Sequence, residues 1–217
     1  MMTSLFQSFD PSSKFFNLNW MMMIFSTMLI PMNFWLKNSR VNFMKMKTHI
    51  FLMNEMKNNS HQKEILIMSK SLFMMIITNN FIGLIPYNFT TTSNLSISLS
   101  MALPLWFTLM IFGWMKFYNS MFKHLLPLGT PTLIMPMMIL IETMGNMIRP
   151  LSLSIRLTAN MIAGHLLMTL LGDMNNIKTI WMILPIQMFL LIFESIICII
   201  QAYVFSTLMT LYSSEIP

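Results

Sequence analysis

Long stretches without a charged residue are the feature that most constrains the fold of this chain. Residues 71–115 contain no Asp, Glu, Lys or Arg over 45 positions, and residues 179–214 carry one charge, Glu194, in 36 positions. A membrane-spanning helix needs about 20 predominantly apolar residues, whereas soluble elements do not need runs of this length. Because the whole sequence is also 55% hydrophobic and 9% charged, it predicts an all-α integral membrane protein.

The lengths of the apolar runs predict the number of crossings. We expect a single membrane domain, residues 1–217, with about five membrane helices, at residues 15–36, 71–87, 95–115, 128–171 and 179–214. The last of these extends about 54 Å as a helix, well beyond the roughly 30 Å of hydrocarbon. Since no polar loop divides it, the last two helices are predicted to be long and strongly tilted and to form a hairpin.

The residue usage indicates where the chain is made. It has 29 Met but only 4 Ala and 2 Val, which is typical of an AT-rich gene and of a genetic code in which AUA also specifies Met. Mitochondrial genomes commonly combine both features, and the N-terminal residues do not have the Arg-rich, Ser-rich composition of an import leader. We therefore expect a mitochondrially encoded, multi-pass protein of the inner membrane.

Basic residues are concentrated between the first two predicted spans. Seven of the thirteen Lys and Arg residues lie within residues 37–70, where apolar side chains also recur at helical spacing from Phe43 to Met56. This pattern predicts an amphipathic helix on the membrane surface, not binding of nucleic acid. By the positive-inside rule the segment lies on the matrix side, with the N terminus in the intermembrane space and the C terminus in the matrix.

Ionisable residues at membrane depth are the candidate functional residues. Arg156 lies in the apolar stretch Leu151–Leu171, where a central arginine costs roughly 3 kcal/mol on insertion scales and about 10 or more in simulations. His165 and Glu194 can each bind and release a proton, whereas Arg156 stays protonated. We expect the first two to belong to a proton path. The fixed cation would attract a mobile carboxylate and block direct proton hopping between two paths.

Helical periodicity places these residues on defined faces. On an ideal helix Arg156 lies within an arc of about 40° that also contains Glu142, Arg149 and Asn160. His165 lies about half a turn away from Arg156 and about 13 Å further along the axis. The helix therefore presents two polar sites on different sides, with Arg156 between them.

A second polar stripe lies on the last helix, where Gln187, Glu194 and Gln201 repeat every seven residues. Packed in a hairpin, this stripe can pair with polar residues of the preceding helix. Ordinary polar contacts between membrane helices are an alternative for part of the set. We expect such packing contacts at Asn146, Arg149 and Gln187.

Two motifs in the C-terminal third resemble the subunit a family of mitochondrial ATP synthase. One is RLTANMIAGHLL at Arg156–Leu167, preceded by IETMGNMIRPLSLSIR, and the other is IIQAYVFSTLMTLY at Ile199–Tyr212. The stretch NNFIGLIPYNFTTTSNL at Asn79–Leu95 is also similar to that family. The resemblance extends over essentially the whole chain and is weakest before Lys70, and the motif that contains Arg156 is highly specific.

The resemblance implies a stator subunit that provides two offset half-channels to the carboxylates of a rotating c-subunit ring, coupling proton flow to rotation and ATP synthesis. It implies no catalysis by the chain alone and no cofactor, and it names as partners the c ring, other membrane and peripheral-stalk subunits, lipid and protons. By matching positions, Arg156 corresponds to the essential arginine, and His165 and Glu194 to the intermembrane-space half-channel. Glu142 corresponds to the carboxylate nearer the matrix exit, and Asn160 and Gln201 correspond to the polar lining on the matrix side or to a contact between the helices.

Two other classes of protein are weighed against this interpretation. A haem-carrying membrane subunit of a respiratory oxidoreductase needs paired histidines within helices, but His49, His61 and His124 fall in basic segments and only His165 is embedded. A purely structural membrane subunit would tolerate the loss of Arg156. The sequence also lacks a glycine-rich phosphate-binding loop, so nucleotide binding by this chain is not expected.

Overall fold

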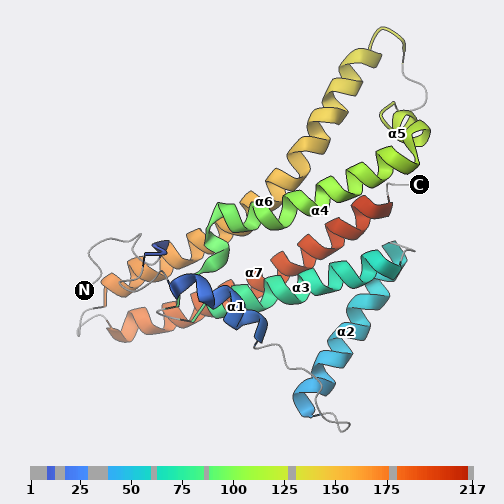
Figure 1. Cartoon of the computed structure of the whole chain (residues 1–217). Helices are drawn as coiled ribbons and strands as arrows, with labels where there is room; N and C mark the ends of the chain where they lie inside the picture. The colour runs from blue at the N-terminus through green and yellow to red at the C-terminus, as the bar shows by residue number, and fades with distance from the viewer. Residues whose placement is uncertain are drawn as a thin grey trace.

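The part of the chain that the computed structural model describes is residues 9–12, 18–28, 39–59, 63–85, 88–126, 131–175 and 180–214. These residues form helices and connecting turns, with no strand among them, which confirms the all-α fold class. Figure 1 shows α1 (Met21–Met28), α2 (Arg40–Asn59), α3 (Lys63–Gly83), α4 (Leu95–Lys116), α5 (Tyr118–His124), α6 (Met135–Asp173) and α7 (Ile180–Ser214). Two short 3₁₀ turns lie at Leu18–Trp20 and Thr91–Ser93.

Four helices of the described part are long and apolar enough to cross a membrane, at Glu64–Gly83, Leu95–Lys116, Met135–Asp173 and Ile180–Ser214. The protein is therefore a multi-pass membrane protein, as predicted. Half of the expected first span, residues 15–36, lies outside the described residues, and its described half consists of the first 3₁₀ turn and the eight residues of α1.

The predicted basic segment is helical on both sides of a short connection. The helix expected at residues 71–87 begins at Lys63, so Lys70 lies within α3. A lysine at this position can extend its long side chain toward the polar boundary of the membrane. In α2, Leu52 and Met56 are buried, while Phe43, Ile50 and other apolar residues are exposed. The position of α2 on the matrix surface remains a prediction.

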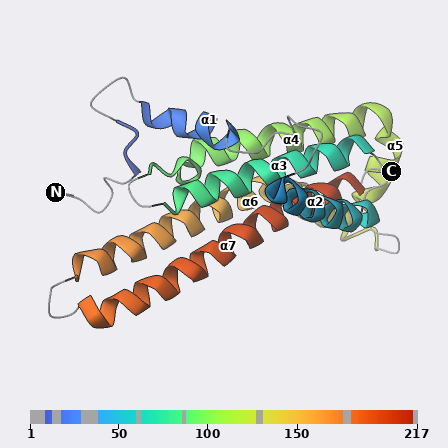
Figure 2. The ribbon, with the colours of Figure 1, turned by 90° about the horizontal axis from the view of Figure 1, so that it is seen from below.

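Four long helices run side by side in a bundle (Figures 1 and 2). α7 packs mainly along α3, and α6 packs mainly along α4. The contact face of α7 is a stripe at every fourth residue that continues from Glu194 with small side chains, namely Cys198, Ala202, Ser206 and Thr210, all buried. Small residues allow membrane helices to approach closely. This stripe therefore fixes the position of Glu194 inside the protein.

The two longest helices, α6 and α7, run antiparallel and form the predicted hairpin, whose closed end projects beyond α3 and α4 (Figure 2). α6 has 39 residues, and Pro150 lies inside it and is buried. A proline cannot donate the helical hydrogen bond and bends a helix. The N-terminal part of α6, yellow in Figure 1, runs away from α7, whereas its C-terminal part stays alongside. The hairpin is therefore open at one end.

Candidate functional site

A pocket between the C-terminal half of α6 and the N-terminal half of α7 contains three of the predicted site residues. This His165 pocket has a volume of about 130 Å³, and its polar lining comes from Asn160, His165 and Glu194. The other lining residues are mainly apolar, and they are Leu84, Met161, Ala163, Gly164, Leu167, Leu190, Phe193, Ile197 and Cys198. The two arms of the hairpin thus bring together polar groups that are distant in the sequence.

Close contact between α6 and α7 holds the Glu194 carboxylate in this pocket. A Cβ atom added at Gly164 would lie 2.7 Å from Glu194 Oε1 and 2.8 Å from Glu194 Cδ, so the carboxylate lies against the backbone of α6. One turn earlier on α6, Met161 Sδ lies 3.8 Å from Cys198 Sγ, which extends the same antiparallel register. A glycine is therefore needed at position 164 to leave room for the carboxylate.

Two polar atoms that belong to the His165 pocket have no hydrogen-bond partner within the described residues. They are His165 Nε2 and Glu194 Oε1, and the residue Glu194 is only 8% exposed. Buried polar groups almost always bond to protein or to ordered water. A polar cavity needs roughly 10–15 Å³ to hold one water molecule. The His165 pocket therefore has the volume and the polar atoms for a small group of waters between the imidazole and the carboxylate.

The imidazole of His165 is also held from outside the hairpin. The backbone of Gly83 at the end of α3 lies beside it. The ring of Phe9 meets it edge to face, with ring centroids 6.2 Å apart and an interplanar angle of 89°. The sequence pattern gave no signal for Phe9, because this contact joins the N-terminal segment to α6 only through the tertiary fold.

Arg156 is an exposed side chain on α6 and lies outside the contacts of this helix with α4 and α7. Its neighbours on that face, Ser152, Ala159 and Ala163, are exposed small residues. Within the described residues no ion pair involves Arg156. A guanidinium at membrane depth needs a compensating partner or water. On this face, the compensation has to come from beyond the described part of the chain.

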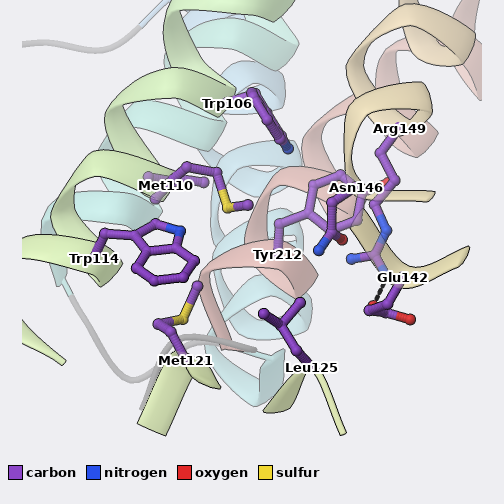
Figure 3. A pocket seen from close by; sticks show the side chains of 10 residues that line it. Trp106, Met110, Trp114, Met121, Leu125, Glu142, Asn146, Arg149 and Tyr212 are labelled. Atoms are coloured by element: carbon purple, nitrogen blue, oxygen red, sulfur yellow. Dashed lines mark ion pairs between the residues drawn. The ribbon is translucent and has the colours of Figure 1, made fainter. Parts of the chain in front are cut away.

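A second pocket lies where α4, α5, α6 and α7 meet (Figure 3). This Arg149 pocket has a volume of about 50 Å³, and it is lined by Trp106, Leu109, Met110, Trp114, Met121, Leu125, Glu142, Asn146, Arg149 and Tyr212. Arg149 Nη2 lies 3.7 Å from Glu142 Oε1, so these two residues of α6 form an ion pair. The Arg149 guanidinium also lies over the ring of Tyr212, with Cζ 5.2 Å from the ring centroid.

The two pockets occupy different parts of α6, with Arg156 between them. Along an ideal helix Arg156 is about 10 Å from Arg149 and about 13 Å from His165. Gln201 is half-buried on α7 and lines neither pocket. The predicted polar residues therefore separate into one group with Glu142 and one with Asn160, His165 and Glu194.

The protein is a bundle of long apolar helices with ionisable groups in two separate pockets. This arrangement is typical of multi-pass membrane subunits that move ions. The model of the ATP synthase A chain family matches residues 15–214, and the chain belongs to this family. It is 51% identical to ATP synthase subunit a of Locusta migratoria, 48% to that of Drosophila melanogaster and 47% to that of Aedes albopictus. Each comparison covers 100% of this chain and 100% of the relative.

Family membership confirms the resemblance seen in the sequence. The chain is a membrane subunit of ATP synthase and is not catalytic alone. This result decides against the oxidoreductase alternative and leaves the roles of individual residues to be argued from their geometry.

Proposed function

We propose that the two pockets are parts of two offset half-channels, in a subunit that acts as the proton channel and stator of the ATP synthase membrane sector. The observation that carries this proposal is the arrangement on α6. Glu142 lines one pocket, His165 and Glu194 meet in the other, and Arg156 is exposed between them.

A proton moves through this arrangement in two separate steps. It passes Glu194 and His165 and then binds a carboxylate of the neighbouring c ring, which becomes neutral and can rotate into lipid. Another ring carboxylate, arriving from the lipid side, releases its proton along the path that contains Glu142. Asn160 and Gln201 belong to the polar lining of these routes.

Arg156 separates the two steps. A guanidinium does not deprotonate in proteins, so it cannot pass a proton from one pocket to the other. Its exposed position on α6 allows the ionised carboxylate of a ring subunit to approach it. The attraction favours the charged form of that carboxylate at the point between release and renewed protonation.

The membrane potential supplies the driving force. Moving one charge through 100 mV is worth about 2.3 kcal/mol, so several protons are needed for each ATP. We place the chain in the mitochondrial inner membrane, with residues 37–70 in the matrix and the N terminus in the intermembrane space. The concentration of basic residues in that segment supports this orientation. The proposed domain is residues 1–217, with a first span at residues 15–36.

The test replaces Arg156 with glutamine in the assembled ATP synthase, reconstituted in liposomes. We expect Arg156→Gln to abolish ATP synthesis driven by an imposed proton gradient, while native gels show the normal amount of complex. Lys116→Gln, which removes an exposed positive charge at the end of α4, is the matched control and should couple normally. Normal coupling in Arg156→Gln would contradict the proposal and favour a purely structural subunit.

A further inference from the structure

The Arg149 pocket contains a contact between α6 and α7 that has no assigned role. Arg149 comes from α6, and Tyr212 comes from the last turn of α7. The guanidinium carbon lies 5.2 Å from the centroid of the tyrosine ring, within the range of a cation–π interaction. Figure 3 shows Tyr212 in the middle of the pocket, with Arg149 and Glu142 on one side and Trp106 and Trp114 on the other.

The same guanidinium reaches Glu142, with Nη2 3.7 Å from Oε1. Side chains that pair easily on one helix are three or four residues apart, but these two are seven apart. Arg149 therefore has to extend along α6 in one particular direction to make the contact. An arginine side chain loses considerable rotamer entropy when it is held in this way. A group that already restricts Arg149 reduces the further loss on pairing with Glu142.

The walls of the pocket favour such a role for the aromatic ring. The α4 side chains that face the ion pair are bulky and apolar, among them Trp106, Met110 and Trp114. Exclusion of water by these groups strengthens an interaction between charges. The side chains of Arg149 and Glu142 are 30% and 37% exposed, so the pair is partly shielded and still accessible to water.

We propose that Tyr212 is a positioning residue, which holds Arg149 and through it sets the position of the Glu142 carboxylate. The end of α7 thereby controls the geometry of the proton-release path. This inference rests on the proposed function of Glu142 in that path. A side chain at position 212 without an aromatic face leaves Arg149 less restricted and Glu142 less precisely placed.

The test compares Tyr212→Phe with Tyr212→Leu in reconstituted ATP synthase. Both variants lack the hydroxyl group, so the comparison isolates the aromatic ring. We expect ATP-driven proton pumping, per assembled complex, to be about two- to tenfold slower in Tyr212→Leu than in Tyr212→Phe, the range that a cation–π contact supports. Tyr118→Leu on α5, where the ring is exposed, is the control and should pump as the unmodified complex does.

A double-mutant cycle separates positioning from general packing. If Tyr212 acts through Arg149, Tyr212→Leu has no further effect in a complex that already carries Arg149→Gln. An undiminished effect in that background overturns the inference. Should Tyr212→Leu lower the amount of assembled complex, Tyr212→Met replaces it as an unbranched variant without a ring, under the same criteria.

The failure of this inference can be distinguished from a failure of the proposed function. The variant Glu142→Gln is measured in the same assay. If Glu142→Gln slows pumping and Tyr212→Leu pumps as Tyr212→Phe does, Glu142 keeps its role and the positioning role of Tyr212 is wrong. If Glu142→Gln pumps normally, the role proposed for Glu142 is itself wrong, and the inference about Tyr212 is overturned with it.

Discussion

Replacing Gly164 with alanine measures how closely the hairpin holds the Glu194 carboxylate. The new Cβ would lie 2.7 Å from Oε1, 2.8 Å from Cδ and 3.2 Å from Cγ of Glu194. Separations below 3.0 Å are essentially never adopted by a real Cβ, so the carboxylate has to move. It is the far end of a flexible side chain, which makes its displacement easier than separation of α6 and α7. The change therefore acts on the position of one functional group.

The energies predict that stability and activity respond differently to Gly164→Ala. Moving a side chain off its rotamer costs about 0.5–1.5 kcal/mol. Replacing glycine by alanine inside a helix gains about 1 kcal/mol in return. The net change in stability is therefore small, whereas a misplacement of about 1 Å in a reacting group can slow a reaction by roughly a hundredfold. We expect assembled complex in normal amounts and ATP synthesis slower by about ten- to a hundredfold.

The assay is ATP synthesis driven by an imposed proton gradient in liposomes, with thermal unfolding of the solubilised complex measured in parallel. Gly145→Ala is the matched control, because a Cβ at that position on the same helix has no neighbour within 4 Å. Gly172→Ala is a second one, since its nearest neighbour is Gln187 Nε2 at 3.9 Å, an ordinary contact. Synthesis at the same rate in Gly164→Ala and Gly145→Ala would refute the argument that the carboxylate needs this space.

Two further substitutions test contacts that position α1 and His165. Ser26→Ala removes a fully buried hydroxyl that donates a 2.5 Å hydrogen bond to Asn79 Oδ1. We expect this substitution to destabilise the complex by about 1–3 kcal/mol in thermal unfolding. Thr27→Ala, at an exposed position of the same helix, is the control. Phe9→Ala removes the edge-to-face contact with His165, which is worth about 0.5–1.5 kcal/mol. We expect it to slow gradient-driven ATP synthesis by about two- to tenfold, whereas Phe9→Tyr should leave the rate unchanged. Equal rates in both variants would contradict a positioning role for the ring.

The sequence predicted the helices and the separation of Glu142 from His165 because both depend on local periodicity. Asn160, which was expected on the face of Arg156, instead lines the His165 pocket. Long apolar runs with few charges predicted α6 and α7, and the half-turn between Arg156 and His165 placed these two residues on different faces. The exposed Arg156 and the half-buried His165 agree with that separation. The presence of His165 and Glu194 in one pocket agrees with the expected hairpin. These inferences needed no knowledge of how α7 sits against α3.

Contacts that depend on the register between helices could not be predicted in this way. The space at Gly164, the ring of Phe9 and the position of Tyr212 over Arg149 each join segments that are far apart in the sequence. The sequence carries one further signal, namely the repeat of small residues at Cys198, Ala202, Ser206 and Thr210. Such a repeat indicates the face along which a membrane helix packs closely. It would have placed Glu194 on the buried face of α7.

The length of α6 explains why a single helix can serve both half-channels without joining them. From Glu142 to His165 its axis extends about 35 Å, and the strong tilt predicted for this helix makes their separation along the membrane normal smaller. The two pockets can therefore lie at different depths in the membrane while one helix carries both. Between them the exposed face of α6 offers Arg156, which keeps its proton, and neighbours such as Ala159 and Ala163, which cannot carry one. In the proposed function, a proton therefore has no continuous route along α6, and a carboxylate of the c ring connects the two pockets.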